Sequence, residues 1–292
     1  MARVRELDGE DMTDCTVTEG PQKLYLDLLE KALLFTLWPE PLIPVEALNY
    51  RRPAPARFLV AAVSKVLRSV GFQLTQIKRP TTQAKIEGRV WPGFADTMIG
   101  AKRLENVRSC VETVLRDGVE GDFIETGVWR GGSCIYMRAI LAVNEVDDRT
   151  VFVADSFEGL PDPEPERYPV DAGDKHHVHS YLAVSKEQVE ENFRKYGLLD
   201  DQVVFLKGWF KDTLPSAPIE KLAVLRLDGD MYGSTMDALE SLYPKLSAGG
   251  FCIIDDYALP GCKKAVHDYL EQNGIDVDIE EIDWTGSYWR KP

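Results

Sequence analysis

Two short acidic sequences stand directly after two apolar segments of the chain. Asp228-Gly229-Asp230 follows the segment 222–227, and Asp255-Asp256 follows the segment 251–254. If both segments are neighbouring parallel strands, their carboxyl ends meet at one edge of the sheet and three or four carboxylates converge there. Carboxylates this close raise one another's pKa unless a cation lies between them.

Oxygen ligands without a nearby cysteine or histidine are typical of a Mg²⁺ site rather than a zinc site. A bound divalent cation stabilises and orients an alkoxide, and a ligating carboxylate can take the proton of the alcohol. Because the loop after Asp228 carries Met231 and no lysine or histidine directly beside it, Asp228 is our candidate for both metal ligand and general base. The alternative is that these acids are solvated strand ends or helix caps, which suits Asp230 best.

A glycine-containing turn follows an earlier apolar segment, in the order Glu125-Thr126-Gly127-Val128-Trp129, and Gly131-Gly132-Ser133 opens the next helix. Glycines here let the backbone approach a ligand, and the helix offers free N–H groups. The spacing differs from the dinucleotide pattern G-x-G-x-x-G, and Glu125 would repel a pyrophosphate but suits a sulfonium or ammonium group. The turn therefore favours a ligand with a sulfonium or ammonium charge over a nicotinamide dinucleotide, with a purely structural turn as the alternative.

Two further segment ends complete this predicted cofactor site. Asp155-Ser156 follows the second strand, where a carboxylate can accept two hydrogen bonds from a ribose diol. The alternative for Asp155 is to cap the following turn. Gly208-Trp209 follows the third strand, where the indole ring either covers an adenine face or packs in the core.

Strand–helix alternation from about residue 100 must position these groups. Continuous apolar runs, typical of buried parallel strands, predict strands at 122–126, 151–154, 203–206, 222–227 and 251–254. Amphipathic segments predict helices at 101–115, 133–143, 186–196, 234–246 and 262–272. Thr285-Gly286 interrupts two strand-like runs and predicts a C-terminal antiparallel hairpin. The predicted fold class is α/β, a doubly wound, mostly parallel seven-stranded sheet that ends in this hairpin.

The first 95 residues follow a different pattern. Apolar spacing predicts helices over 24–38 and 58–70, with prolines between them. We therefore predict a helical N-terminal cap or lobe over 1–95 and a catalytic domain over 96–292. Leucine, phenylalanine and tryptophan side chains in the first part indicate a homo-oligomer, unless they cover the cofactor instead.

Bulk properties exclude several classes of protein. The net charge of −14 disfavours binding to nucleic acid and to anionic membranes, although acidity alone also keeps a protein soluble. The sequence contains no apolar run of about 18 residues and no signal-peptide pattern, so we predict a cytoplasmic protein. Five cysteines without a CxxC pair make a zinc site or a disulfide framework improbable.

The sequence resembles the macrocin O-methyltransferase (TylF-type) family. The similarity extends from about residue 92 to 292, and 25–29 resembles the family's first helix. The motifs that carry it are Thr97–Asn106, Glu125–Gly132, Ala154–Phe157, Asp228–Tyr232, Asp255–Tyr257 and Ala265–Tyr269. The resemblance implies a class I methyltransferase fold, S-adenosylmethionine and Mg²⁺ as cofactors, and methyl transfer to a sugar hydroxyl of a bacterial natural product.

The resemblance also implies roles for particular residues. Asp228, Asp255 and Asp256 match the family's metal ligands, and Asp228 matches its base. Segments that match the cofactor loops are Glu125–Trp129 and Asp155–Phe157, while Met98 and Ile99 match a segment that touches the methionine end of the cofactor.

Two regions depart from the family pattern, namely 40–90 and 163–182. The second contains His176, His177 and His179, where family members have a histidine followed by Gln-Tyr. The sequence leaves three roles open for these histidines: part of a lid, ligands of a metal, or a base. Enzymes of this family place acceptor-binding loops in both regions. The resemblance implies a small-molecule glycoside as acceptor, and a phenol or catechol is the alternative.

Overall fold

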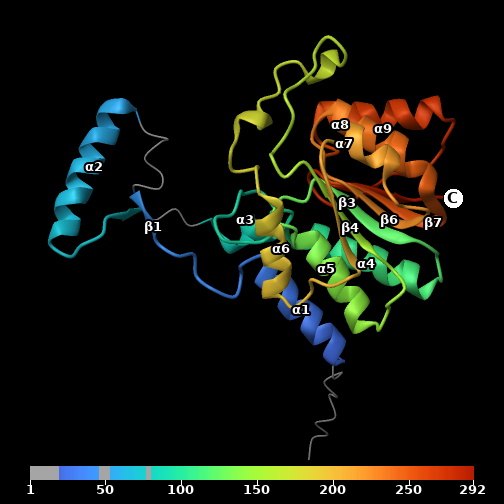
Figure 1. The fold of residues 1–292 in the computed structure, drawn as a ribbon, viewed down its shortest axis with the longest axis horizontal. Helices are drawn as coiled ribbons and strands as arrows, with labels where there is room; N and C mark the ends of the chain where they lie inside the picture. Colours follow the sequence, from blue (N-terminus) through green and yellow to red (C-terminus); the bar gives the residue numbers. More distant parts are fainter. Residues whose placement is uncertain (1–19, 46–52, 77–79) are drawn as a thin grey trace, which may run out of the picture.

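A seven-stranded sheet forms the centre of the computed structural model, which describes residues 20–45, 53–76 and 80–292 (Figure 1). The strand order is β5-β4-β3-β6-β7-β9-β8. Strands β3 to β7 are parallel, and β9 runs antiparallel to both β7 and β8. The strands are β3 Asp122–Thr126, β4 Val151–Asp155, β5 Val203–Lys207, β6 Leu222–Leu227, β7 Leu246–Ile254, β8 Glu280–Glu281 and β9 Ser287–Arg290. The predicted fold class is confirmed.

Helices cover both faces of this sheet, because successive strand residues point to opposite sides. In β3, Phe123 packs into one core cluster and Ile124 into the other. The first cluster holds α1 Pro21–Leu33, α4 Gly100–Arg116, α5 Gly132–Val143 and α6 Lys186–Lys195. The second cluster holds α8 Tyr232–Leu242 and α9 Pro260–Gln272, and α7 Phe210–Thr213 lies beside it (Figure 1).

The predicted elements differ from the observed ones mainly at their ends. Strand β7 begins at Leu246, earlier than expected, because Leu222 pairs with Leu246 across an irregularity that absorbs the intervening polar and glycine residues. The first helix ends at Leu33, since Phe35 takes a left-handed conformation with φ of 53°. Helix α8 ends at Leu242 and is followed by a short 3-10 turn.

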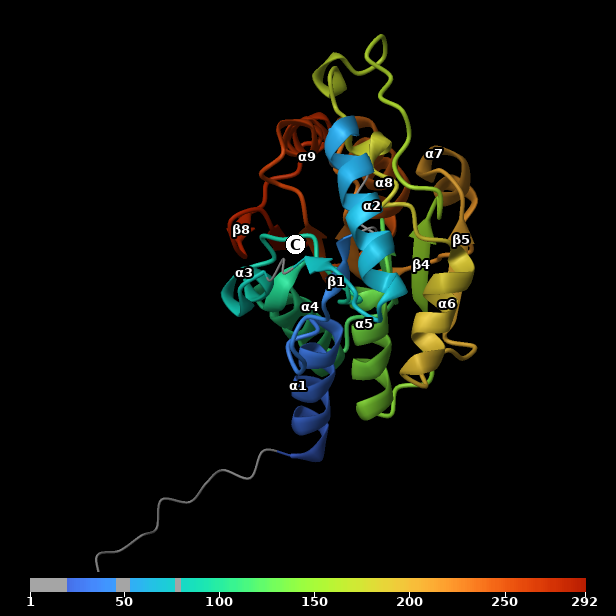
Figure 2. The ribbon, with the colours of Figure 1, turned by 90° about the vertical axis from the view of Figure 1, so that its left-hand side faces the viewer.

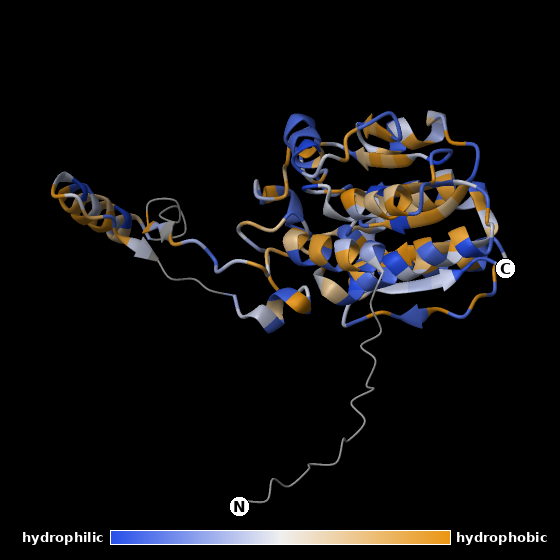
Figure 3. Ribbon diagram, turned by 90° about the horizontal axis from the view of Figure 1, so that it is seen from below, coloured by the Kyte–Doolittle hydropathy of each residue, from blue (hydrophilic) through white to orange (hydrophobic). Residues whose placement is uncertain are grey.

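The N-terminal region contains α1, α2 Ala54–Ser69, α3 Thr82–Ile86 and a two-stranded pair, β1 Ile43–Pro44 with β2 Thr75–Gln76. Helix α1 packs against α5 through Leu26, Leu29 and Leu33. Helix α2 instead lies apart from the rest of the chain, and it carries apolar turns (Figure 3). The predicted boundary at residue 95 stays a prediction. Residues 1–19, 46–52 and 77–79, which include Cys15 and part of the 40–90 region, lie outside the described residues.

The segment between β4 and α6 projects from the body beside α8 in two perpendicular views (Figure 1, Figure 2). It contains 163–182, one of the two regions that depart from the family pattern. We call residues 160–182 the acceptor-side loop. In the described part of the chain, every helix falls short of the length and hydrophobicity that a membrane span requires.

Candidate active site

A cavity of about 350 Å³ opens at the carboxyl ends of the five parallel strands. Ligands bind at this edge in open α/β sheets. The wall includes all three predicted metal ligands. It also includes these predicted cofactor residues: Met98, Ile99, Glu125, Gly127, Val128, Trp129, Ser133, Asp155, Ser156, Gly208 and Trp209.

Two predicted cofactor residues lie behind this wall. Thr126 is the fully buried last residue of β3, and its hydroxyl has no hydrogen-bond partner within the described residues. Phe157 has a φ of 59° and packs against Phe205, with 6.0 Å between the ring centroids. These positions came from contiguous sequence motifs, which do not reveal which members of a motif face the ligand.

The turn after β3 lies directly against the loop after β6. The amide of Asp228 donates to the Thr126 carbonyl at 2.9 Å. Gly127 has a φ of 84°, and a Cβ there would lie only 1.8 Å from the Asp228 carbonyl oxygen. Glycine is therefore required at this position, because any side chain would push the predicted cofactor turn away from the predicted metal ligand.

Asp155 links the turn after β3 to the turn after β4. One carboxylate oxygen accepts from the Val128 amide at 2.8 Å, and the other accepts from the Phe157 amide at 2.7 Å. Burial raises the pKa of Asp155, and these backbone donors oppose the rise. The Ser156 hydroxyl donates to this carboxylate as well, at 3.4 Å, so the alternative role of Asp155 as a cap of the turn is present.

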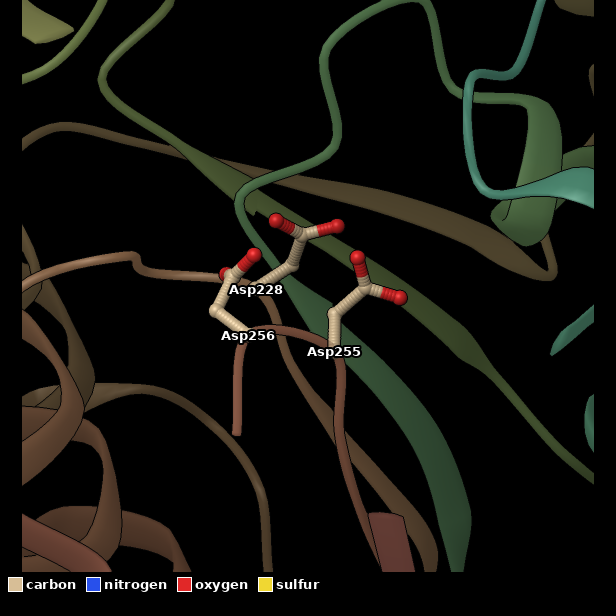
Figure 4. Close-up of side chains that lie close together, drawn as sticks. All are labelled: Asp228, Asp255 and Asp256. Atoms are coloured by element: carbon tan, nitrogen blue, oxygen red, sulfur yellow. The ribbon is translucent and has the colours of Figure 1, made fainter. Parts of the chain in front are cut away.

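The carboxylates of Asp228, Asp255 and Asp256 gather at the ends of β6 and β7 (Figure 4). One oxygen of each residue lies within 4.8 Å of the others. Burial, followed by the repulsion of neighbouring carboxylates, raises the pKa of Asp228 and of Asp256 well above the usual value for aspartate. The three side chains therefore converge, as the sequence predicted.

A buried arginine that the sequence analysis did not single out lies behind this cluster. Arg226 is 0% exposed and is the penultimate residue of β6. Its guanidinium pairs with Glu125 and Asp255 and lies 3.0 Å from Asp228. Arg103 of α4 holds the other oxygen of Asp255. The signal was available, since Arg226 interrupts an apolar strand two residues before Asp228 and so shares its face.

Both oxygens of Glu125 have partners within the protein. One of its oxygens pairs with Arg226, and the other accepts from the Cys134 thiol at 3.0 Å. Burial raises the pKa of Glu125, and the Arg226 charge opposes this rise. The negative charge of Glu125 is thus already balanced in part inside the protein, although the residue reaches the cavity wall.

The acceptor-side loop is fastened to the helix that follows the metal-ligand loop. The buried carboxylate of Asp171 accepts from the amides of Tyr232 and Gly233 at 2.8 and 3.0 Å. It therefore caps the N-terminus of α8, where a negative charge is favourable. Sequence reasoning could not identify this cap, because it comes from a loop far upstream of the helix.

The three histidines of this loop point to different partners. His176 lines the cavity, with its Nδ1 2.7 Å from Asp174. His177 lies 3.5 Å from Asp162, and His179 meets the ring of Trp91 edge-on. Within the described residues, the three aspartates are the one set of side chains with the geometry of a three-ligand metal site.

Comparison with known proteins assigns the chain that forms this cavity to a family. Residues 22–291 match the macrocin-O-methyltransferase (TylF) family. The chain belongs to this family. It is 50% identical to 8-demethyl-8-(2,3-dimethoxy-alpha-L-rhamnosyl)-tetracenomycin-C 4'-O-methyltransferase of Streptomyces olivaceus, over 94% of this chain and 95% of that protein.

Other relatives of this macrocin-O-methyltransferase family member agree. Mycinamicin III 3''-O-methyltransferase of Micromonospora griseorubida is 56% identical over 72% of this chain and 84% of its own. The solved structure of the O-methyltransferase NovP has a TM-score of 0.79 and 46% identity, covering 93% of this chain and 99% of that one. The resemblance is confirmed: the protein is an O-methyltransferase, and its family implies S-adenosylmethionine as methyl donor.

The carboxylate cluster of this family member fits a divalent cation. Its ligands are oxygen atoms, which Mg²⁺ prefers. Two buried guanidinium groups, those of Arg103 and Arg226, face a larger number of buried carboxylates, so negative charge remains unbalanced. Asp228 and Asp256 contact the cavity, where a cation would have access to them.

Proposed function

We propose that this O-methyltransferase transfers the methyl group of S-adenosylmethionine to a hydroxyl of a deoxysugar carried by a bacterial natural product. The observation that carries this proposal is the 50% identity, over 94% of the chain, to an enzyme whose name specifies position 4' of a rhamnosyl group. The acceptor-side loop and the carboxylate cluster line one cavity, so an acceptor has room beside the predicted cofactor turn.

The mechanism that we propose uses Asp228, Asp255 and Asp256 to hold Mg²⁺, which when bound makes an adjacent alcohol more acidic. Asp228 takes the proton of that alcohol. The acceptor oxygen then forms a bond to the methyl carbon as the bond between this carbon and the sulfur breaks. The close contact between Gly127 and Asp228 sets the donor turn beside the base, which favours in-line attack.

A panel of glycosides tests this function. Purified protein with S-adenosylmethionine and Mg²⁺ should add one methyl group to a deoxysugar glycoside, detected by mass spectrometry. EDTA should abolish the transfer, and excess Mg²⁺ should restore it. Without the cation, nothing makes the alcohol more acidic, and the negative charge of the carboxylate cluster stays unbalanced. Phenol and catechol acceptors, which need the same metal site, serve as the comparison. Methylation of phenols alone would contradict the sugar assignment, and full activity in EDTA would contradict the metal.

We also propose that the protein forms a homo-oligomer through α2. Phe58 and Phe72 are 79% and 67% exposed, which is unusual for large apolar side chains. Residues 51–79 contain seven arginines and lysines and no acid, whereas the whole chain has a net charge of −14. A second, acidic copy of the chain is therefore the partner that suits this segment in both polarity and charge.

Replacing Phe58 with glutamate should convert the oligomer to monomers, because a charge would be buried in the interface. Light scattering after size-exclusion chromatography measures the mass. Val178→Glu, at a valine that is similarly exposed on the acceptor-side loop, controls for the added charge and should leave the mass unchanged. A wild-type protein that is monomeric at micromolar concentration would refute the assignment.

A further inference from the structure

The pair formed by Asp174 and His176 has no part in the mechanism above, yet its histidine lines the cavity. The Asp174 carboxylate accepts from the His176 backbone amide at 2.8 Å and lies 2.7 Å from Nδ1 of the ring. Since an ionised carboxylate only accepts hydrogen bonds, Nδ1 carries a hydrogen. The remaining ring nitrogen, Nε2, makes no hydrogen bond to any described residue and is available to a ligand.

The acceptor-side loop holds this pair in place from both sides. Asp171 attaches the loop to the start of α8. Beyond the histidines, the Tyr181 hydroxyl donates to the Pro92 carbonyl, and Nε1 of Trp129 donates to the Tyr181 carbonyl at 3.1 Å. His176 therefore sits on a fastened segment, which is the condition for a binding residue of defined geometry.

Asp230 lies near His176 in the same cavity wall. Its amide donates to the Asp256 carboxylate at 3.1 Å, whereas its own carboxylate has no hydrogen bond to the described residues. No ion pair joins the two side chains in the described chain, so Nε2 of His176 and the Asp230 carboxylate remain open to a bound molecule.

We propose that His176, oriented by Asp174, binds a second hydroxyl of the acceptor sugar, adjacent to the hydroxyl that is methylated. This inference rests on the proposed function, because it requires a sugar diol. The reacting oxygen must lie at Asp228, and Asp230 connects that loop to His176 along the wall. A hydroxyl both donates and accepts, so Nε2 recognises it whether or not the ring is protonated. The pair thus selects which hydroxyl of the sugar reaches the base.

The test uses the full-length enzyme with S-adenosylmethionine and Mg²⁺. The acceptors are p-nitrophenyl α-L-rhamnoside and the monodeoxy analogue that keeps the methylated hydroxyl but lacks its neighbour. In the wild type, loss of this neighbour should lower kcat/KM about tenfold, as expected for one hydrogen bond. His176→Ala should lower kcat/KM for the parent glycoside about tenfold, mainly through KM, and reduce the ratio between the two acceptors to about one. Asp174→Asn should reduce this ratio by a smaller factor.

His177→Ala is the matched control, because His177 pairs with Asp162 and does not itself line the cavity, and it should keep the wild-type ratio. Calorimetry with S-adenosylhomocysteine confirms that each variant retains its cofactor site. If His176→Ala does not fold, His176→Gln is judged by the same ratio. An unchanged ratio in a folded His176 variant overturns this inference alone. A wild type that methylates no glycoside overturns the proposed function, and this inference with it.

Discussion

Replacing Asp228 with asparagine should reduce methyl transfer by about a thousandfold, which is within the range of removing a general base. The amide has nearly the same size and can still accept from Arg226, which lies 3.0 Å away from Asp228 in the wild type. It supplies neither a negative charge for a cation nor a site for the alcohol proton. S-adenosylhomocysteine should bind with unchanged affinity, because the backbone contact between Gly127 and residue 228 does not involve the side chain.

Turnover is measured by mass spectrometry with saturating cofactor, and cofactor binding by calorimetry. The increase in melting temperature that Mg²⁺ gives the wild type should also be lost in the variant. Asp201→Asn, at an exposed turn before β5, is the matched control and should behave as wild type in all three measurements. Activity within tenfold of the wild type would remove Asp228 from the mechanism.

The second large effect is expected on stability. Arg226→Met should lower the free energy of unfolding by about 3–5 kcal/mol at neutral pH, because breaking a buried ion pair leaves uncompensated charges behind. Three carboxylates lose their shared partner, namely those of Glu125, Asp228 and Asp255. A methionine fills much of the space but offers neither charge nor hydrogen bonds.

This loss should depend on pH in a defined direction. Burial already raises the pKa of Glu125 and Asp228 in the folded protein, and the Arg226 charge limits the rise. Without that charge both pKa values rise further, so the folded variant binds more protons than the unfolded chain. A carboxyl with a raised pKa stabilises the fold at low pH, and this contribution is lost as the pH rises through the folded pKa. The variant should therefore be more stable near pH 5 than near pH 8.

Urea denaturation at the two pH values, without added metal, measures this difference. Arg116→Met is the control, since Arg116 pairs with Asp117 on the surface, and it should cost less than about 1 kcal/mol. Equal losses at both pH values in the Arg226 variant would show that lost packing, not charge, dominates.

The parallel strands could be predicted because they are buried on both faces. A strand such as 222–227 must then be a continuous apolar run, which is visible without knowing its neighbours. The ligand-binding edge followed from the same reasoning, since acids and glycines at the ends of parallel strands must meet. The first half of β7 escaped prediction because its residues Ser247–Gly250 have no apolar pattern. Leu246 pairs with Leu222 of β6, and Gly249 and Gly250 form backbone hydrogen bonds with Lys291, so only tertiary contacts make this extension part of the sheet.

Contacts between distant parts of the chain could not be predicted. Arg226 is a charged residue in an otherwise apolar strand, but its partners Glu125 and Asp255 come from β3 and from the loop after β7. Asp171 lies in an irregular segment where no periodicity constrains the orientation of a side chain. Thr126 and Phe157 belong to motifs that we predicted to bind the cofactor, yet their positions behind the wall depend on backbone conformation that a sequence motif does not encode.

The cap that Asp171 provides for α8 has a consequence for retargeting this enzyme to new acceptors. One way to change the acceptor is to replace residues 160–182 with the corresponding loop of a relative. Such a graft also replaces Asp171, which caps α8, the helix that begins just after the proposed catalytic base. A chimera that lacks an acid at this position would combine a new acceptor pocket with a frayed catalytic loop. The same loop therefore affects both the choice of acceptor and the rate of catalysis. Asp171 is the residue to keep when the rest of the loop is exchanged.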